Sequence, residues 1–332
     1  MSPATPTPTV VVRTPADAVL AAPLMLGYWP EGSVCAIVLD ADQRVTLVMR
    51  WDAETPGAIP VPPRAVAGDP SGGVVHLVAY SAITSRDQIP AAPATSAWRH
   101  AGDSLRGSGV SLGWVLVAST YGDKVLWTFV EGSPAELEVR AIPASASTRQ
   151  AQRWGLPPWS ATRSDYVGDI DPDRDVRDHV IMQLPTQSPV VEASRDAAIA
   201  TVRDRLADEQ VSAGDIAEVL VSLTDVQVRD TVLWDLMQED PSRWRAIAAR
   251  MARIVAAAPD THVAAPATLL AILRWQMGDG SRATAAIERA LSADPAYTLA
   301  RLVDGCLATG MHPGTWRGGL ADLSREACRR AA

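Results

Sequence analysis

Short apolar runs separated by turn-forming residues dominate the first 130 or so positions of the chain. Six runs rich in Val, Ile, Leu and aromatic residues have the length of strands, at 9–13, 33–39, 44–50, 74–80, 112–118 and 125–130. A helix is predicted after the first run, because Thr14, Pro15 and Asp17 form a start signal and Gly27 a stop. Another helix is predicted near 95–106. Hairpins mixed with intervening helices predict an α/β domain, with a mixed β-sheet and flanking helices.

Beyond residue 193 the apolar positions recur at helical spacing, and no run has the character of a strand. Ser212 and Asp215 have the spacing of a capping box. This part is therefore predicted to be an all-α helical array. The stretch before it is rich in Pro, Ser and Asp, with one short helix expected near 147–154. The predicted organisation is a disordered leader at 1–8, an α/β domain at 9–135, an irregular linker with that short helix at 136–192 and a helical domain at 193–332.

The segment 264–295 resembles a tetratricopeptide helix pair. Small Ala271 and Ala283 would let two antiparallel helices approach closely, and Gly278-Asp279-Gly280 would form the tight turn between them. Asp294-Pro295 would end the second helix. A repeat of this kind buries its faces only against neighbours, so the pair is expected to pack on other helices or on a partner.

Four stretches combine Trp, Gly and Pro in a distinctive way. They are Arg13-Thr14-Pro15-Ala16-Asp17, Leu26-Gly27-Tyr28-Trp29-Pro30-Glu31-Gly32-Ser33-Val34, Trp154-Gly155-Leu156-Pro157-Pro158, and the stretch from Trp275 to Pro295. In these stretches the chain resembles an actinobacterial family known only as domain-of-unknown-function family 4192, and the similarity extends over nearly the whole chain from residue 9. The resemblance implies relatives, but it implies no reaction, cofactor or ligand.

Composition narrows the classes of function. A net charge of −8 argues against a grip on phosphate backbones, so no nucleic-acid partner is expected. The chain has no apolar stretch of about 18 residues and its first residues lack the features of a secretory signal, so we expect a cytoplasmic protein without membrane contact. The three cysteines, Cys35, Cys306 and Cys328, lie far apart and form no metal-ligand motif. No metal or other cofactor is predicted.

Motifs that would indicate catalysis fail on inspection. The acidic string 169–175 alternates carboxylates as a calcium loop does, but its sixth position is Arg174 and its twelfth is Val180, so a solvated loop is the better interpretation. The glycines of 107–113 precede a strand, whereas a phosphate loop precedes a helix. His76 lies in an apolar strand, where a buried structural histidine is favoured over a catalytic base.

Two functional hypotheses follow. The leading one is a protein-interaction or scaffold protein without catalytic activity, which binds another protein or itself through Trp154, Trp159 and Trp275. The alternative is a small-ligand sensor or an enzyme. Its pocket would lie at the strand ends of the α/β domain and be lined by Arg13, Asp17, Trp29 and Glu31.

Overall fold

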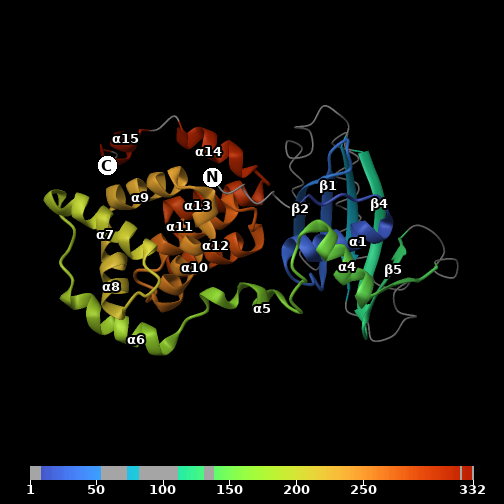
Figure 1. Cartoon of the computed structure of the whole chain (residues 1–332), viewed down its shortest axis with the longest axis horizontal. Helices are drawn as coiled ribbons and strands as arrows, with labels where there is room; N and C mark the ends of the chain where they lie inside the picture. Colours follow the sequence, from blue (N-terminus) through green and yellow to red (C-terminus); the bar gives the residue numbers. More distant parts are fainter. Residues whose placement is uncertain (1–8, 54–72, 82–110, 131–137, 322–323, 331–332) are drawn as a thin grey trace. The chain divides into compact units, whose positions relative to one another are not determined.

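The computed structural model describes residues 9–53, 73–81, 111–130, 138–321 and 324–330 (Figure 1). Contacts between residues divide the chain into two compact units, with the boundary between Tyr166 and Val167. We call residues 6–166 the sheet unit and residues 167–332 the helical unit, and describe each by itself. The order of elements confirms the predicted fold class, a mixed α/β part followed by an all-α part. The predicted leader at 1–8 and the helix predicted near 95–106 lie outside the described residues.

The sheet unit is built on six strands in the order β2-β1-β3-β4-β5-β6. Their bounds are β1 Ser33–Leu39, β2 Val45–Asp52, β3 Val74–Tyr80, β4 Ser111–Tyr121, β5 Lys124–Phe129 and β6 Arg140–Pro143. Only β3 and β4 run parallel, so the sheet is mixed. The strand predicted at 9–13 is wrong, because this segment makes a single bridge, between Val11 and Arg44, beside the β1–β2 turn. Strand β6 was not predicted.

Two helices form one apolar cluster with the sheet. Helix α1 (Pro15–Leu26) and helix α4 (Ala144–Trp154) lie together beside the sheet in Figure 1. The same cluster contains residues of β1, β3, β4 and β5, including Ile37, Tyr80, Leu116 and Trp127. The Tyr80 hydroxyl donates a hydrogen bond to the Val19 carbonyl at 2.8 Å, which ties β3 to α1 inside the core. A separate buried cluster, Ala36, Val38, Val75 and Leu77, uses the alternate positions of β1 and β3. Strand β1 is therefore buried on both faces, which explains its unbroken apolar run.

Gly27 ends α1 in a conformation and a space that only glycine fits. Its φ is +84°, and a Cβ built on it would lie 2.2 Å from the Tyr166 ring. We expect Gly27→Ala to destabilise the sheet unit by about 2 kcal/mol, partly from the left-handed backbone and partly from overpacking. Gly32→Ala isolates the backbone cost of about 1 kcal/mol, since Gly32 has φ +67° and nothing within 4 Å of its Cβ position. Urea unfolding of both variants checks this, and equal losses would contradict the role of Tyr166.

The stretch 136–192, predicted as an irregular linker with one short helix near 147–154, contains that helix and also further regular structure. This stretch contains β6, α4, α5 (Arg163–Val167) and α6 (Arg174–Gln183), with a 3₁₀ turn between α5 and α6 and another after α6. The polar residues that suggested a linker are caps and turns between short helices. The Asp173 side chain, for example, accepts a hydrogen bond from the Val176 N–H at the start of α6. The acidic string 169–175 is therefore a helix junction.

The helical unit continues from α6 with nine further helices among the described residues. They are α7 Arg195–Ala207, α8 Ala213–Ser222, α9 Val226–Gln238, α10 Pro241–Ala257, α11 Ala264–Gln276, α12 Gly280–Ala293, α13 Thr298–Ala308, α14 Pro313–Ala321 and α15 Arg325–Arg330. Helix α11 is buried from Ala265 to Trp275 and packs against α10, α12 and α13. The two helices predicted within 264–295 are present, and Gly278 joins them with φ +80°. Their relation to tetratricopeptide repeats stays a prediction.

The part of the chain that the structure describes contains no candidate for a membrane-spanning helix. None of its helices is both long enough and apolar enough to cross a bilayer.

Candidate functional site

The residues proposed at the strand ends take part in local structure. The Asp17 carboxylate accepts hydrogen bonds from the Thr14 N–H at 2.9 Å, the Thr14 hydroxyl at 2.9 Å and the Arg13 N–H at 3.1 Å. These bonds form the capping box of α1. Asp17 is therefore engaged by the helix start, while the Arg13 side chain is exposed.

Trp29 and Glu31 lie in the loop between α1 and β1. The Trp29 indole is only 5% exposed, with its ring 5.0 Å from Tyr80 and 5.9 Å from Trp159. Glu31 is exposed, and its backbone N–H donates to the Trp29 carbonyl. Within the described residues, no hydrogen bond or ion pair joins these two residues to Arg13 or Asp17. The four residues thus do not form one polar site.

The tryptophans proposed to bind a partner lie mainly inside their own units. Trp154 is buried in the core of the sheet unit, and Trp159 packs partly buried against the same cluster. Trp275 is buried in α11, with its ring 5.9 Å from Trp316 of α14. Burial leaves the indoles of Trp154 and Trp275 little area to offer a partner.

His76 is held in a form that suits neither a base nor a metal ligand. Its ring is 4% exposed and stacks on Trp114 at 4.3 Å between ring centres. The Trp114 N–H donates to His76 Nδ1 at 2.9 Å, so the ring proton of the neutral form resides on Nε2. Burial lowers the pKa of His76 to about 4. Neither nitrogen therefore offers a free lone pair at neutral pH.

The cysteines are also unsuited to chemistry. All three thiols are free and buried. Burial raises the pKa of Cys35 to about 12, and it raises the pKa of Cys306 and of Cys328. A nucleophilic or metal-binding cysteine needs the thiolate, which burial disfavours here. Within the described ranges, no three His, Cys, Asp or Glu side chains are grouped to hold a metal ion.

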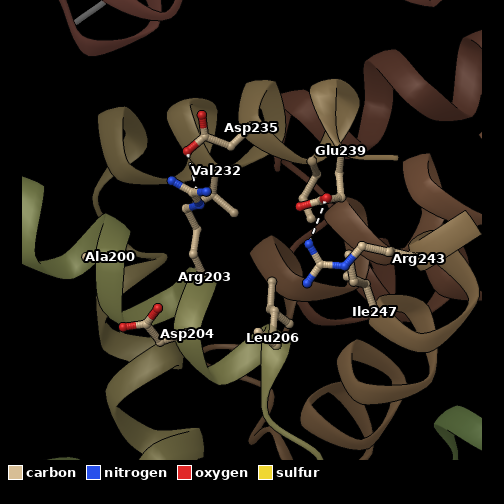
Figure 2. Close-up of a pocket in the computed structure, with 11 residues that line it drawn as sticks. Ala200, Arg203, Asp204, Leu206, Val232, Asp235, Glu239, Arg243 and Ile247 are labelled. Atoms are coloured by element: carbon tan, nitrogen blue, oxygen red, sulfur yellow. Dashed lines mark hydrogen bonds and ion pairs between the residues drawn. The ribbon is translucent and has the colours of Figure 1, made fainter. Parts of the chain in front are cut away.

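A cleft in the helical unit is the strongest candidate site. It lies between α7, α9 and α10 and has a volume of about 270 Å³ (Figure 2). Its buried apolar surface consists of Leu206, Val232, Leu236 and Ile247. Its rim carries charge on all three helices, namely Arg203, Asp204, Asp235, Glu239 and Arg243, and it includes two alanines, Ala200 and Ala207.

The charges of the cleft are unevenly paired. Asp235 is held by two nitrogens of the Arg325 guanidinium on α15, at 2.8 and 3.1 Å. Arg203 approaches the same carboxylate only to 3.7 Å, and its side chain is 57% exposed. Arg243 pairs with Glu239 at 2.9 Å. Figure 2 shows Arg203 and Arg243 on opposite sides of the cavity, each beside its carboxylate.

Sequence reasoning missed this cleft because its residues come from three helices. The one local signal is on α7, where Ala200 and Ala207 are seven residues apart and so share a helical face. Both alanines are exposed. Because small residues on a solvated face add little to the stability of a fold, packing does not explain them. Small side chains there leave the cleft open.

Comparison with known proteins places both units in one family. A family model described as Domain of unknown function (DUF4192) matches residues 15–314. The chain belongs to this family. The DUF4192 match begins at the first residue of α1 and includes every residue that lines the cleft, whereas α15 lies beyond its end. Neither a curated protein nor a solved structure matches the chain significantly.

Proposed function

We propose that this DUF4192 protein is a non-catalytic interaction protein that holds a protein partner in the cleft between α7, α9 and α10. The observation that carries the proposal is the combination of a buried apolar floor with a charged rim. Apolar burial supplies affinity at such a site, and a few placed charges supply orientation and specificity.

The composition of the cleft supports binding over catalysis. No His, Cys, Ser or Lys is among the residues that line it. Its carboxylates Asp235 and Glu239 already accept hydrogen bonds from Arg325 and Arg243, which leaves them less available to act on a substrate. The alternative, a sensor or enzyme with a pocket at the strand ends, has less support, because Asp17 is engaged by the α1 cap and Trp29 is buried.

Other features support a protein partner and a cytoplasmic location. A net charge of −8 favours a protein partner over a nucleic acid. Three free, buried thiols suit a reducing compartment, so we place the protein in the cytoplasm. The α11–α12 pair, if it is a tetratricopeptide unit, adds a helical scaffold of the kind that often supports partner binding.

Filling the cleft tests the proposal. Ala200→Trp places a large side chain at the exposed rim without touching the buried floor, and we expect it to reduce partner capture by about tenfold or more, as for loss of a central contact. Ala308→Trp is the matched control, because Ala308 is an exposed alanine on α13 away from the cleft. Both tagged full-length variants would be used to capture proteins from the native host, with quantitative mass spectrometry as readout.

The comparison between the two variants decides the outcome. A protein that wild type and Ala308→Trp retain, and that Ala200→Trp loses, supports the cleft as the binding site. If every captured protein persists with Ala200→Trp, the cleft is not used and the proposal is wrong. Thermal unfolding of both variants confirms that they are folded before capture is compared.

A further inference from the structure

We infer that the cleft between α7, α9 and α10 recognises the carboxyl-terminal residue of a peptide chain, with an apolar side chain on the floor and the terminal carboxylate at Arg203. The inference rests on the proposed function and gives the partner a defined chemistry. It is built from the pairing of charges around Asp235, the size of the cavity and the nature of its floor.

Arg203 is the more loosely paired of the two arginines that line the cleft. The carboxylate of Asp235 is already occupied by two hydrogen bonds from Arg325. Arg203 lies 3.7 Å from it, beyond ordinary hydrogen-bond length, and more than half of its side chain is exposed. A guanidinium in this state gains charge-assisted hydrogen bonds when a carboxylate arrives.

Arg243, on the opposite rim, differs because it has its own carboxylate. It donates to Glu239 at 2.9 Å from the start of the next helix. This pair leaves little positive charge on its side of the cleft. An incoming carboxylate therefore has more to gain at Arg203, which is the more loosely paired of the two arginines.

The volume of the cavity suits a single residue of a peptide ligand. About 270 Å³ is near the lower limit of roughly 300–1,000 Å³ for small-molecule sites, which suits a ligand part of about one residue. The floor is purely aliphatic, with Leu206, Val232, Leu236 and Ile247. Within a peptide chain, an aliphatic side chain and a carboxylate occur together on one residue only at the carboxyl terminus. Leucine combines them in a shape that suits an aliphatic floor.

Asp204, on the same helix as Arg203, would help the cleft to distinguish one peptide from another. It lines the cavity one position further along α7. A carboxylate accepts hydrogen bonds from peptide N–H groups and repels a second anion. A peptide that ends in leucine presents one N–H and one carboxylate, whereas a peptide with clustered acidic residues would bring charge against Asp204.

Binding of defined peptides to the full chain tests this chemistry. The probe is fluorescein-Gly-Ser-Gly-Ser-Leu with a free carboxylate, measured by fluorescence anisotropy. We expect its carboxyl-terminal amide to bind about tenfold more weakly, through loss of the charge-assisted hydrogen bonds. A version that ends in glycine should weaken to a similar extent, because it leaves the apolar floor uncovered.

Substitution of Arg203 tests the assignment of the cation. Arg203→Ala should weaken the leucine peptide about tenfold and leave the amide unchanged, while Arg203→Lys should restore part of the affinity by keeping the charge. Arg301→Ala is the matched control, because Arg301 is an exposed arginine on α13 and should have no effect. Arg203 is exposed, so loss of the fold is not expected, and circular dichroism checks it.

The outcomes separate this inference from the proposed function. Equal binding of acid and amide, or tighter binding of an internal aspartate peptide than of the leucine terminus, overturns the carboxyl-terminal chemistry. If no peptide binds while Ala200→Trp still loses its captured partner, the chemistry is wrong and the interaction site stands. If the leucine peptide binds but no captured protein depends on Ala200, the inference holds for a small peptide ligand and the proposed partner role fails.

Discussion

As the pH falls from about 6.5 to 4, the sheet unit is expected to lose about 3 kcal/mol of stability through His76 alone. Burial lowers the pKa of this imidazole to about 4 in the fold, against an ordinary value of 6.5. The unfolded chain therefore binds the proton first. The contribution of neutral His76 is fully present above pH 6.5, is lost as the pH falls through this window, and changes no further below about 4.

The variant His76→Gln removes the titration and keeps an acceptor for the Trp114 N–H. The variant lacks the pH-dependent contribution of His76. The difference in unfolding free energy between wild type and variant should therefore shrink by about 3 kcal/mol as the pH falls across the window. Pulsed hydrogen exchange of β3 and β4 peptides along a urea series measures this for the sheet unit. A difference that does not change with pH would show that His76 is protonated as easily in the fold as outside it.

Asp169→Ala is expected to cost the helical unit about 3 kcal/mol, because it removes the carboxylate of a buried guanidinium. Arg274 of α11 is 3% exposed and donates to Asp169 at 2.5 Å. It also donates to the Arg282 carbonyl at 3.4 Å, but this bond does not neutralise its charge. Without Asp169 the guanidinium loses the carboxylate that the structure places against it.

The reverse substitution should cost less. Arg274→Met removes the buried charge and fills its space, while the Asp169 side chain, at 40% exposure, is hydrated by solvent. We expect a loss of about 1 kcal/mol, in the range of volume-conserving changes. Hydrogen exchange of α11 peptides along a urea series compares the two. A larger loss for Arg274→Met would mean that packing of the arginine stem, and not burial of its charge, dominates.

Features with local causes were predictable from the sequence. The start of α1 follows from Thr14, Pro15 and Asp17, and the structure contains the capping box that these residues predict. The Ser212–Asp215 box at α8 is likewise present. Each signal acts between residues three positions apart, so it does not depend on the rest of the fold. The strands from β1 to β5 were predictable for a similar reason, because apolar runs of strand length mark them.

The stretch 136–192 shows where local reasoning failed. Helix α6 buries only Val180, so few apolar positions mark it in the sequence. A short helix of this kind is held by caps and by distant backbone, such as the hydrogen bond from the Asp173 N–H to the Ala256 carbonyl at 3.0 Å. A hydrogen bond to a residue more than eighty positions away cannot be predicted from the sequence around the helix.

By itself, the sequence determined strands β1 to β5, the helical character of the chain beyond residue 193, the caps that start several helices and the family to which the chain belongs. Only the tertiary structure decided that Trp29 and Trp275 are buried, that Asp169 meets Arg274, and that Arg325 holds Asp235 more closely than Arg203 does. The physical reason is that caps and periodicity depend on neighbours within one or two turns. Burial and the pairing of charges depend on residues that folding brings together from distant parts of the chain.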